Sequence, residues 1–227
     1  MNTIYKIYLV IIVAIICVFP IQASAQKIIW HAGQITFWNN TLLEGNISYN
    51  WLAEMVLMRQ PDGRISTFSA EQVYSFGWFD YSQHKYRSFT SLQNKIAKGQ
   101  TNQVFFEVCM DGSLTVVRRL KRPHGLWKRA FGHPSNFTDR PTIAKEPDHF
   151  DYFVHDAGRL VSLDRFYTDI YTPIMIIYDQ ELTRYVQRHN LNDRTLLARL
   201  VLIDQYNILV QHDTRTASAR QYGTAPN

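Results

Sequence analysis

The feature that most constrains the fold is a series of short alternating segments between residues 33 and 121, each bounded by turn-forming residues. Within residues 43–49, apolar and polar residues alternate, which is typical of a strand with one solvent-facing side. Pro61-Asp62-Gly63 and Asp111-Gly112 separate two further pairs of segments, and glycine accepts the positive φ that tight hairpins use. The pattern predicts about eight strands in an antiparallel β unit, either a small barrel or a sandwich-like sheet.

The expected strands of this unit cover residues 34–38, 43–49, 55–60, 64–68, 74–81, 85–91, 104–110 and 113–121, and one more hairpin is expected over 149–155 and 159–163. After residue 164 the period changes. Apolar residues between 196 and 208 recur at helical spacing behind Asn192-Asp193, either of which is a good N-cap. Asp179-Gln180-Glu181 places acid where a helix begins, and residues 166–178 are also expected to be helical. We therefore expect an α+β fold, with a C-terminal segment of about two or three short helices after the β unit.

The first residues have the pattern of a secretory signal peptide. Lys6 is followed by an apolar run over residues 7–19, then Pro20, then Ala23-Ser24-Ala25. The run is shorter than the about 20 residues that a membrane-spanning helix needs, so cleavage is favoured over an uncleaved anchor. We expect the mature protein to begin at Gln26 and to be exported, to the periplasm, the outer envelope or the medium, with no stable transmembrane segment after cleavage.

The distribution of proline indicates where the rest of the chain divides into regions. Four of the eight prolines lie between residues 122 and 148, where regular structure is unfavourable because proline lacks a backbone donor. In chain order we expect a signal peptide (1–25), an antiparallel β unit (26–122), a Pro-rich basic loop (123–148), a β-hairpin with a helical segment packed on the β unit (149–211) and a polar tail (212–227).

Six cations without an intervening acid form a candidate binding patch for an anionic partner: Arg118, Arg119, Lys121, Arg122, Lys128 and Arg129. We expect most of these charges to be solvent-exposed, where charges of one sign act together on an anionic partner. Export makes nucleic acid an improbable partner, so the patch points to an anionic envelope component or an acidic protein. The alternative, which we favour, is a merely solvated strand end and loop.

Motifs for catalysis are weak in this chain. His149, Asp151, His155 and Asp156 cluster in one segment, but a zinc or hydrolytic site needs ligands that converge. Asp80 and Glu107 are a further candidate pair of carboxylates, for which the separation is the test. The sequence contains no nucleophile elbow, phosphate-binding loop or dinucleotide fingerprint, and we expect no cofactor. Cys109, the cysteine that remains after cleavage, is expected to be a buried strand residue.

Aromatic residues gather between residues 78 and 89: Trp78, Phe79, Tyr81, Tyr86 and Phe89. On adjacent strands such residues serve either as core and cross-strand pairs or as a platform that stacks sugars or docks a partner. Because side chains alternate along a strand, Trp78 and Phe79 point to opposite faces. At most half of the cluster therefore shares one surface.

Short motifs spread along the chain resemble a family of uncharacterised exported β-rich proteins of Gram-negative bacteria. They are Gly33-Gln34-Ile35, the turn Asn39-Asn40-Thr41, Glu44-Gly45-Asn46-Ile47, the segment from Phe105-Phe106-Glu107 to Gly112, and Tyr206-Asn207. The resemblance implies export and a β domain with a helical C-terminus. It implies no activity and no functional residue.

Two classes of function remain open on this basis. The first is a non-enzymatic exported module of the cell envelope, with a binding or structural role, which the short strands and exposed-aromatic candidates favour. The second is a hydrolase of unrecognised type, with a site near His149, Asp151 and His155. Convergence of these three side chains in a cleft would favour the enzyme.

Overall fold

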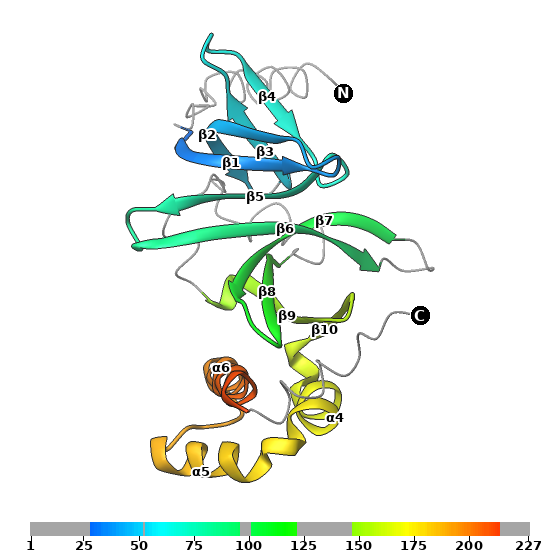
Figure 1. Cartoon of the computed structure of the whole chain (residues 1–227), viewed down its shortest axis with the longest axis vertical. Helices are drawn as coiled ribbons and strands as arrows, with labels where there is room; N and C mark the ends of the chain where they lie inside the picture. Colours follow the sequence, from blue (N-terminus) through cyan, green and yellow to red (C-terminus); the bar gives the residue numbers. More distant parts are fainter. Residues whose placement is uncertain (1–27, 52, 96–100, 122–146, 214–227) are drawn as a thin grey trace, which may run out of the picture.

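The protein is built on one antiparallel sheet of ten strands, as a computed structural model shows (Figure 1). The structure describes residues 28–51, 53–95, 101–121 and 147–213. The strands are β1 (His31–Phe37), β2 (Leu42–Asn50), β3 (Met55–Arg59), β4 (Ile65–Phe68), β5 (Val73–Asp80), β6 (Lys85–Lys95), β7 (Thr101–Met110), β8 (Thr115–Leu120), β9 (Phe150–Asp156) and β10 (Arg159–Ser162). The α+β prediction and the β-rich character are confirmed.

The strand order departs from the chain order at one place. The order across the sheet is β10-β9-β8-β7-β6-β5-β1-β2-β3-β4, so β1 lies between β2 and β5. After the edge strand β4, the chain crosses back through residues 69–72 and pairs β5 with the free side of β1. Every other neighbouring pair is consecutive in the sequence, which is the local pairing that short turns predict.

The sheet curls strongly, so that strands distant in the order meet across its inner face. Tyr49 of β2 and Phe105 of β7 have ring centroids 5.9 Å apart, although four strand spacings separate them in the order. Trp51, just after β2, packs on Phe150 of β9 with centroids 5.3 Å apart. In a flat sheet four spacings would measure about 19 Å. The inner face therefore encloses an aromatic core, in which Phe76, Trp78 and Phe89 stack.

Two glycines allow the backbones to approach where the sheet curls. A Cβ on Gly33 would lie 2.4 Å from the carbonyl oxygen of Gly77, and a Cβ on Gly77 would lie 2.7 Å from that of Arg87. Real Cβ atoms do not approach backbone this closely, so only glycine fits at either position.

Replacement of Gly33 by Ala is expected to lower the free energy of unfolding by about 1–3 kcal/mol, since the backbone at Gly77 must move away. The matched control is Gly45→Ala, directly opposite on β2, where the nearest atoms to a new Cβ lie 3.7 Å away. Urea denaturation of both variants measures the difference. Equal midpoints for the two would contradict the close approach at Gly33.

The C-terminal helices cover one end of the sheet, beyond β8, β9 and β10 (Figure 1). They are η3 (Leu163–Arg165), η4 (Phe166–Tyr171), α4 (Thr172–Ile174), η5 (Met175–Tyr178), α5 (Asp179–His189) and α6 (Leu196–His212), whereas the short η2 (Pro147–His149) precedes β9. Thr195 caps α6 by accepting a hydrogen bond from the amide of Ala198. Ile203 and Tyr206 of α6 belong to the same buried cluster as the aromatic core.

A buried side chain joins α6 to the turn between β7 and β8. Asn207 accepts a hydrogen bond from the Leu114 amide (2.8 Å) and donates one to the Leu114 carbonyl (3.0 Å). Gly112 lies against it, because a Cβ there would be 2.6 Å from the Asn207 amide nitrogen. The helical segment is thus tied to the sheet by specific polar contacts as well as by apolar packing.

Several predicted regions fall outside the described residues. They are the signal peptide, most of the Pro-rich loop and most of the polar tail. Among the helices that the structure does describe, none combines the length and the apolar character needed to cross a membrane.

Candidate functional site

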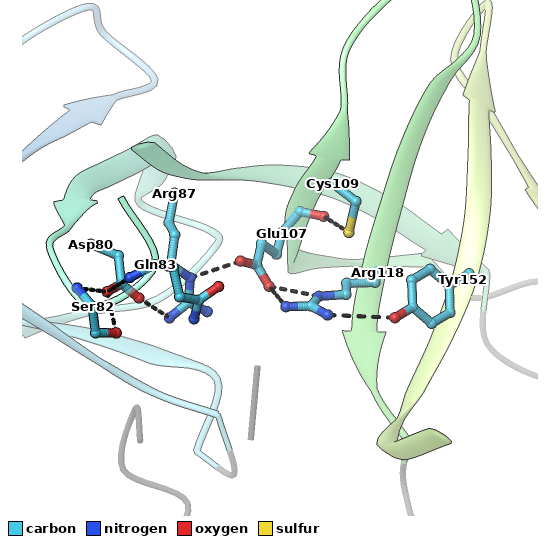
Figure 2. Close-up of polar contacts among 8 residues, drawn as sticks. All are labelled: Asp80, Ser82, Gln83, Arg87, Glu107, Cys109, Arg118 and Tyr152. Carbon is cyan, nitrogen blue, oxygen red and sulfur yellow. Dashed lines mark hydrogen bonds and ion pairs between the residues drawn. The ribbon is translucent and has the colours of Figure 1, made fainter. Parts of the chain in front are cut away.

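A row of buried polar side chains crosses the inner face of the sheet, one from each of five neighbouring strands. We call it the charge ladder, and it consists of Asp80 (β5), Arg87 (β6), Glu107 (β7), Arg118 (β8) and Tyr152 (β9). Figure 2 shows Arg87 between the two carboxylates and Arg118 between Glu107 and Tyr152. Strand register brings the last three together, since Arg118 lies directly opposite both Glu107 and Tyr152.

Glu107 is the centre of the charge ladder. Its Oε1 accepts a hydrogen bond from Nε of Arg87 (2.8 Å), and its Oε2 accepts one from Nε of Arg118 (2.7 Å). Arg87 also lies 3.9 Å from the Asp80 carboxylate. Aromatic rings cover the cations, with the Arg118 guanidinium 4.2 Å from the Phe150 ring centroid. Two acids and two bases thus balance within a buried layer.

Two members of the charge ladder, Asp80 and Arg118, have pKa values shifted in favour of their ionised forms. Burial acts to raise the pKa of Asp80, but hydrogen bonds from the Ser82 hydroxyl and the Ser82 and Gln83 amides outweigh it, so this pKa is lowered. Burial acts to lower the pKa of Arg118, but the facing Glu107, together with Cys109 and the Tyr152 hydroxyl, outweighs burial, so this pKa is raised. The stabilisation from Asp80 is therefore present above about pH 4, its unfolded value, and is lost as the pH falls through the lower folded pKa.

The charges and contacts of the charge ladder favour a role in stabilising the sheet over a role in catalysis. A general acid of the glycosidase kind needs a carboxyl with a raised pKa. Asp80 has a lowered pKa instead, and Arg87 lies between Asp80 and Glu107. The two candidate carboxylates are thus brought near each other, but each is neutralised by arginine.

The histidine segment does not converge on one point. His149 lies in η2, while Asp151 and His155 lie four residues apart on β9, about 13 Å along an extended strand. Asp151 is exposed and faces Arg119 in the sheet register. Among the described residues, no group of three or more His, Cys, Asp or Glu side chains has the arrangement of a metal site. The hydrolase alternative stays a prediction.

The basic residues divide between the core and the surface. The expectation of exposure is wrong for Arg118, which is 6% exposed because Glu107 and Tyr152 hold it in the charge ladder. Arg119 is largely buried and pairs with Glu54 at 3.4 Å. Lys121 is exposed and donates a hydrogen bond to the Asp148 carbonyl. Arg122, Lys128 and Arg129 lie outside the described residues. An anion-binding role for this stretch stays a prediction.

The aromatic cluster divides between the two faces of the sheet as alternation predicts. Trp78 and Phe89 are fully buried in the core. Phe79, Tyr81 and Tyr86 are 40%, 76% and 53% exposed, and we call these three residues the aromatic strip. Phe79 lies opposite Tyr86 in the register and packs edge-on against Tyr81. Exposed large aromatics gathered on adjacent strands are typical of surfaces that bind a partner or ligand.

An open hollow of about 520 Å³ lies beside the aromatic strip. Its lining residues are Ala32, Gly33, Gln34, Glu44, Gly45, Asn46 and Tyr86. Small residues of β1 and β2 therefore form much of the hollow, and Tyr86 from β6 contributes an aromatic ring. Its volume lies in the range of about 300–1,000 Å³ that small-molecule sites occupy.

Comparison of the chain with known protein families, with curated proteins and with solved structures finds no match.

The hollow brings together residues that no motif in the sequence links to one another. Tyr86 belongs to the aromatic cluster that the sequence singles out, whereas Gln34, Glu44 and Asn46 occur there only as polar positions of alternating strands. The pairing of β1 with both β2 and β5 brings these segments together.

Cys109 is exposed, which corrects the prediction of a buried strand residue. The register between β7 and β8 shifts between Val108 and Met110, so Cys109 is the extra residue of a β-bulge. Burial was expected because a cysteine in an apolar strand is commonly buried, but a bulge interrupts the alternation of side chains and directs this one outward.

Proposed function

We propose that this protein is an exported, non-enzymatic binding module of the cell envelope, whose ligand site is the hollow together with the aromatic strip. The observation that carries the proposal is the position of Tyr86, whose half-exposed ring contributes to the hollow and belongs to the strip. Export is an expectation from the N-terminal sequence. The hollow supplies the place at which such an exported protein would bind its ligand.

The architecture supports binding at this place. The lining residues lie on the paired strands β1, β2 and β6, so their backbone positions are set by the sheet ladder. Sites on strands hold their side chains more precisely than sites on loops, and a prearranged site loses less entropy when a ligand binds. The charge ladder lies on the inner face behind this surface, where it stabilises the same sheet.

The proposal predicts that Tyr86→Ala reduces retention of the purified mature protein on isolated cell envelopes, by about tenfold if the ring contributes as a typical aromatic contact does. The matched control is Tyr74→Ala, which removes another half-exposed tyrosine from the start of β5, away from the hollow. Cosedimentation over a range of envelope concentrations measures the apparent affinity of each variant. Equal loss in both variants, or no loss in either, would contradict a ligand site at Tyr86.

A further inference from the structure

We infer that the ligand of the hollow is a neutral oligosaccharide chain. The inference rests on the proposed function, and it adds the chemical class of the ligand. It comes from three properties of the lining, which are its charge, its hydrogen-bonding groups and the way Tyr86 lies over the sheet.

The charge of the lining opposes a polyanion. Among the lining residues that the structure describes, Glu44 is the one carboxylate, and no lysine, arginine or histidine joins it. The nearest arginine in the register is Arg59, opposite Asn46, and its guanidinium lies 4.4 Å from the Trp30 ring centroid. Sites that recognise carboxylate, sulfate or phosphate groups present cations to them. An acidic glycan would instead meet the Glu44 carboxylate.

The polar groups match a ligand rich in hydroxyls. Gln34 and Asn46 each offer an amide that both donates and accepts, and Glu44 offers two accepting oxygens. Gln34 lies directly opposite Glu44, and Asn46 lies opposite Ala32 on the same outer face. The opposed pair Gln34 and Glu44 is about 5 Å apart, and Asn46 lies two residues along β2 from Glu44, about 7 Å away. One extended ligand can therefore reach all three side chains. A hydroxyl group, which both donates and accepts, pairs with either kind of side chain.

Tyr86 supplies a flat apolar surface. Its hydroxyl oxygen lies 2.7 Å from the place where a Cβ on Gly77 would be, so the ring lies across β5 over the glycine backbone. Aromatic residues that cover glycine in this way are a known stabilising arrangement in sheets. The opposite ring face remains open, since Tyr86 is 53% exposed. Sugar rings carry C–H groups on one face and hydroxyls around the edge, which fits a flat ring beside a row of amides.

The test is an NMR titration of the mature protein with three neutral hexasaccharides, cellohexaose, maltohexaose and hexa-N-acetylchitohexaose, and with hexagalacturonate as the acidic probe. We expect a neutral probe to shift the amide signals of Gly33, Gly45 and Asn46. Tyr86→Ala should weaken that binding about tenfold, while Tyr74→Ala leaves it unchanged.

The outcomes separate this inference from the proposed function. Binding of hexagalacturonate at these three amides without binding of any neutral probe would overturn the saccharide class but keep the site. Failure of all four probes, together with envelope retention that still depends on Tyr86, would also overturn the saccharide class alone. Failure of all probes with retention that is independent of Tyr86 would overturn both.

Discussion

Replacement of Glu107 by Ala is expected to lower the free energy of unfolding by about 3–5 kcal/mol, the typical cost of removing one partner from a buried ion pair. Glu107 is 1% exposed and accepts hydrogen bonds from both Arg87 and Arg118. Without it, two guanidinium groups would stay in the core with one carboxylate, that of Asp80, 3.9 Å from Arg87. Urea denaturation at neutral pH measures the loss of stability. A variant that fails to fold would agree with the predicted destabilisation.

The control for this prediction is Asp62→Ala, which removes the exposed ion pair with Arg64. Exposed pairs contribute about 0–1 kcal/mol, since water screens them and both side chains lose entropy. A second comparison removes all four charges together, with Asp80→Asn, Arg87→Met, Glu107→Leu and Arg118→Met, so that no buried charge is left without its partner. Neutral replacements of whole buried ion networks are often neutral or stabilising, so this quadruple variant should be more stable than Glu107→Ala. If Glu107→Ala is as mild as the Asp62 control, the charge ladder does not stabilise the sheet.

Replacement of Asn207 by Ala is expected to lower the free energy of unfolding by about 2–5 kcal/mol, since each buried group left without a hydrogen bond costs about 1–3 kcal/mol. Both the amide and the carbonyl of Leu114 depend on the Asn207 side chain. Leu114 is 2% exposed, so water does not readily replace the lost contacts. Thermal or urea unfolding of the variant gives the value.

Gln211→Ala is the matched control, because it removes an exposed amide side chain from the same helix. Surface changes of this kind usually alter stability by about 0.5 kcal/mol or less. Hydrogen exchange adds a local measurement, since loss of the Asn207 contacts should raise the exchange rate of the Leu114 amide more than that of amides in β2 and β3. Equal stability of the two variants would show that the Leu114 groups find other partners.

Local pattern predicted most of the elements correctly. The strands predicted over 55–60 and 74–81 appear as β3 (Met55–Arg59) and β5 (Val73–Asp80), because turn chemistry and alternation are properties of neighbouring residues. The division of the aromatic cluster, with Phe79 outside and Trp78 inside, followed from the same alternation.

Contacts between segments that are distant in the sequence could not be predicted from local pattern. Arg118 was predicted to be exposed because it lies near the end of a strand that leads into the Pro-rich basic loop, yet its partner Glu107 lies on the adjacent strand in an apolar run. A single acid within Phe105-Phe106-Glu107-Val108 was the available sign that a buried cation would be needed. The hollow depends on the pairing of β1 with β5, for which no local pattern exists.

The pairing of β5 with β1, where the strand order departs from the chain order, also affects how the molecule folds. Among the described strands, nine pairings hold the sheet, and β1 with β5 is the pairing whose partners are not consecutive. The arm from β1 to β4 consists of hairpins with short loops, which form within microseconds. Two pairings close longer loops, because residues 38–72 separate β1 from β5 and residues 121–149 separate β8 from β9. Closure of longer loops raises contact order and slows folding. We therefore expect the docking of β5 on β1 and of β9 on β8 to limit the folding rate, with the edges of these strands open to wrong partners until they pair.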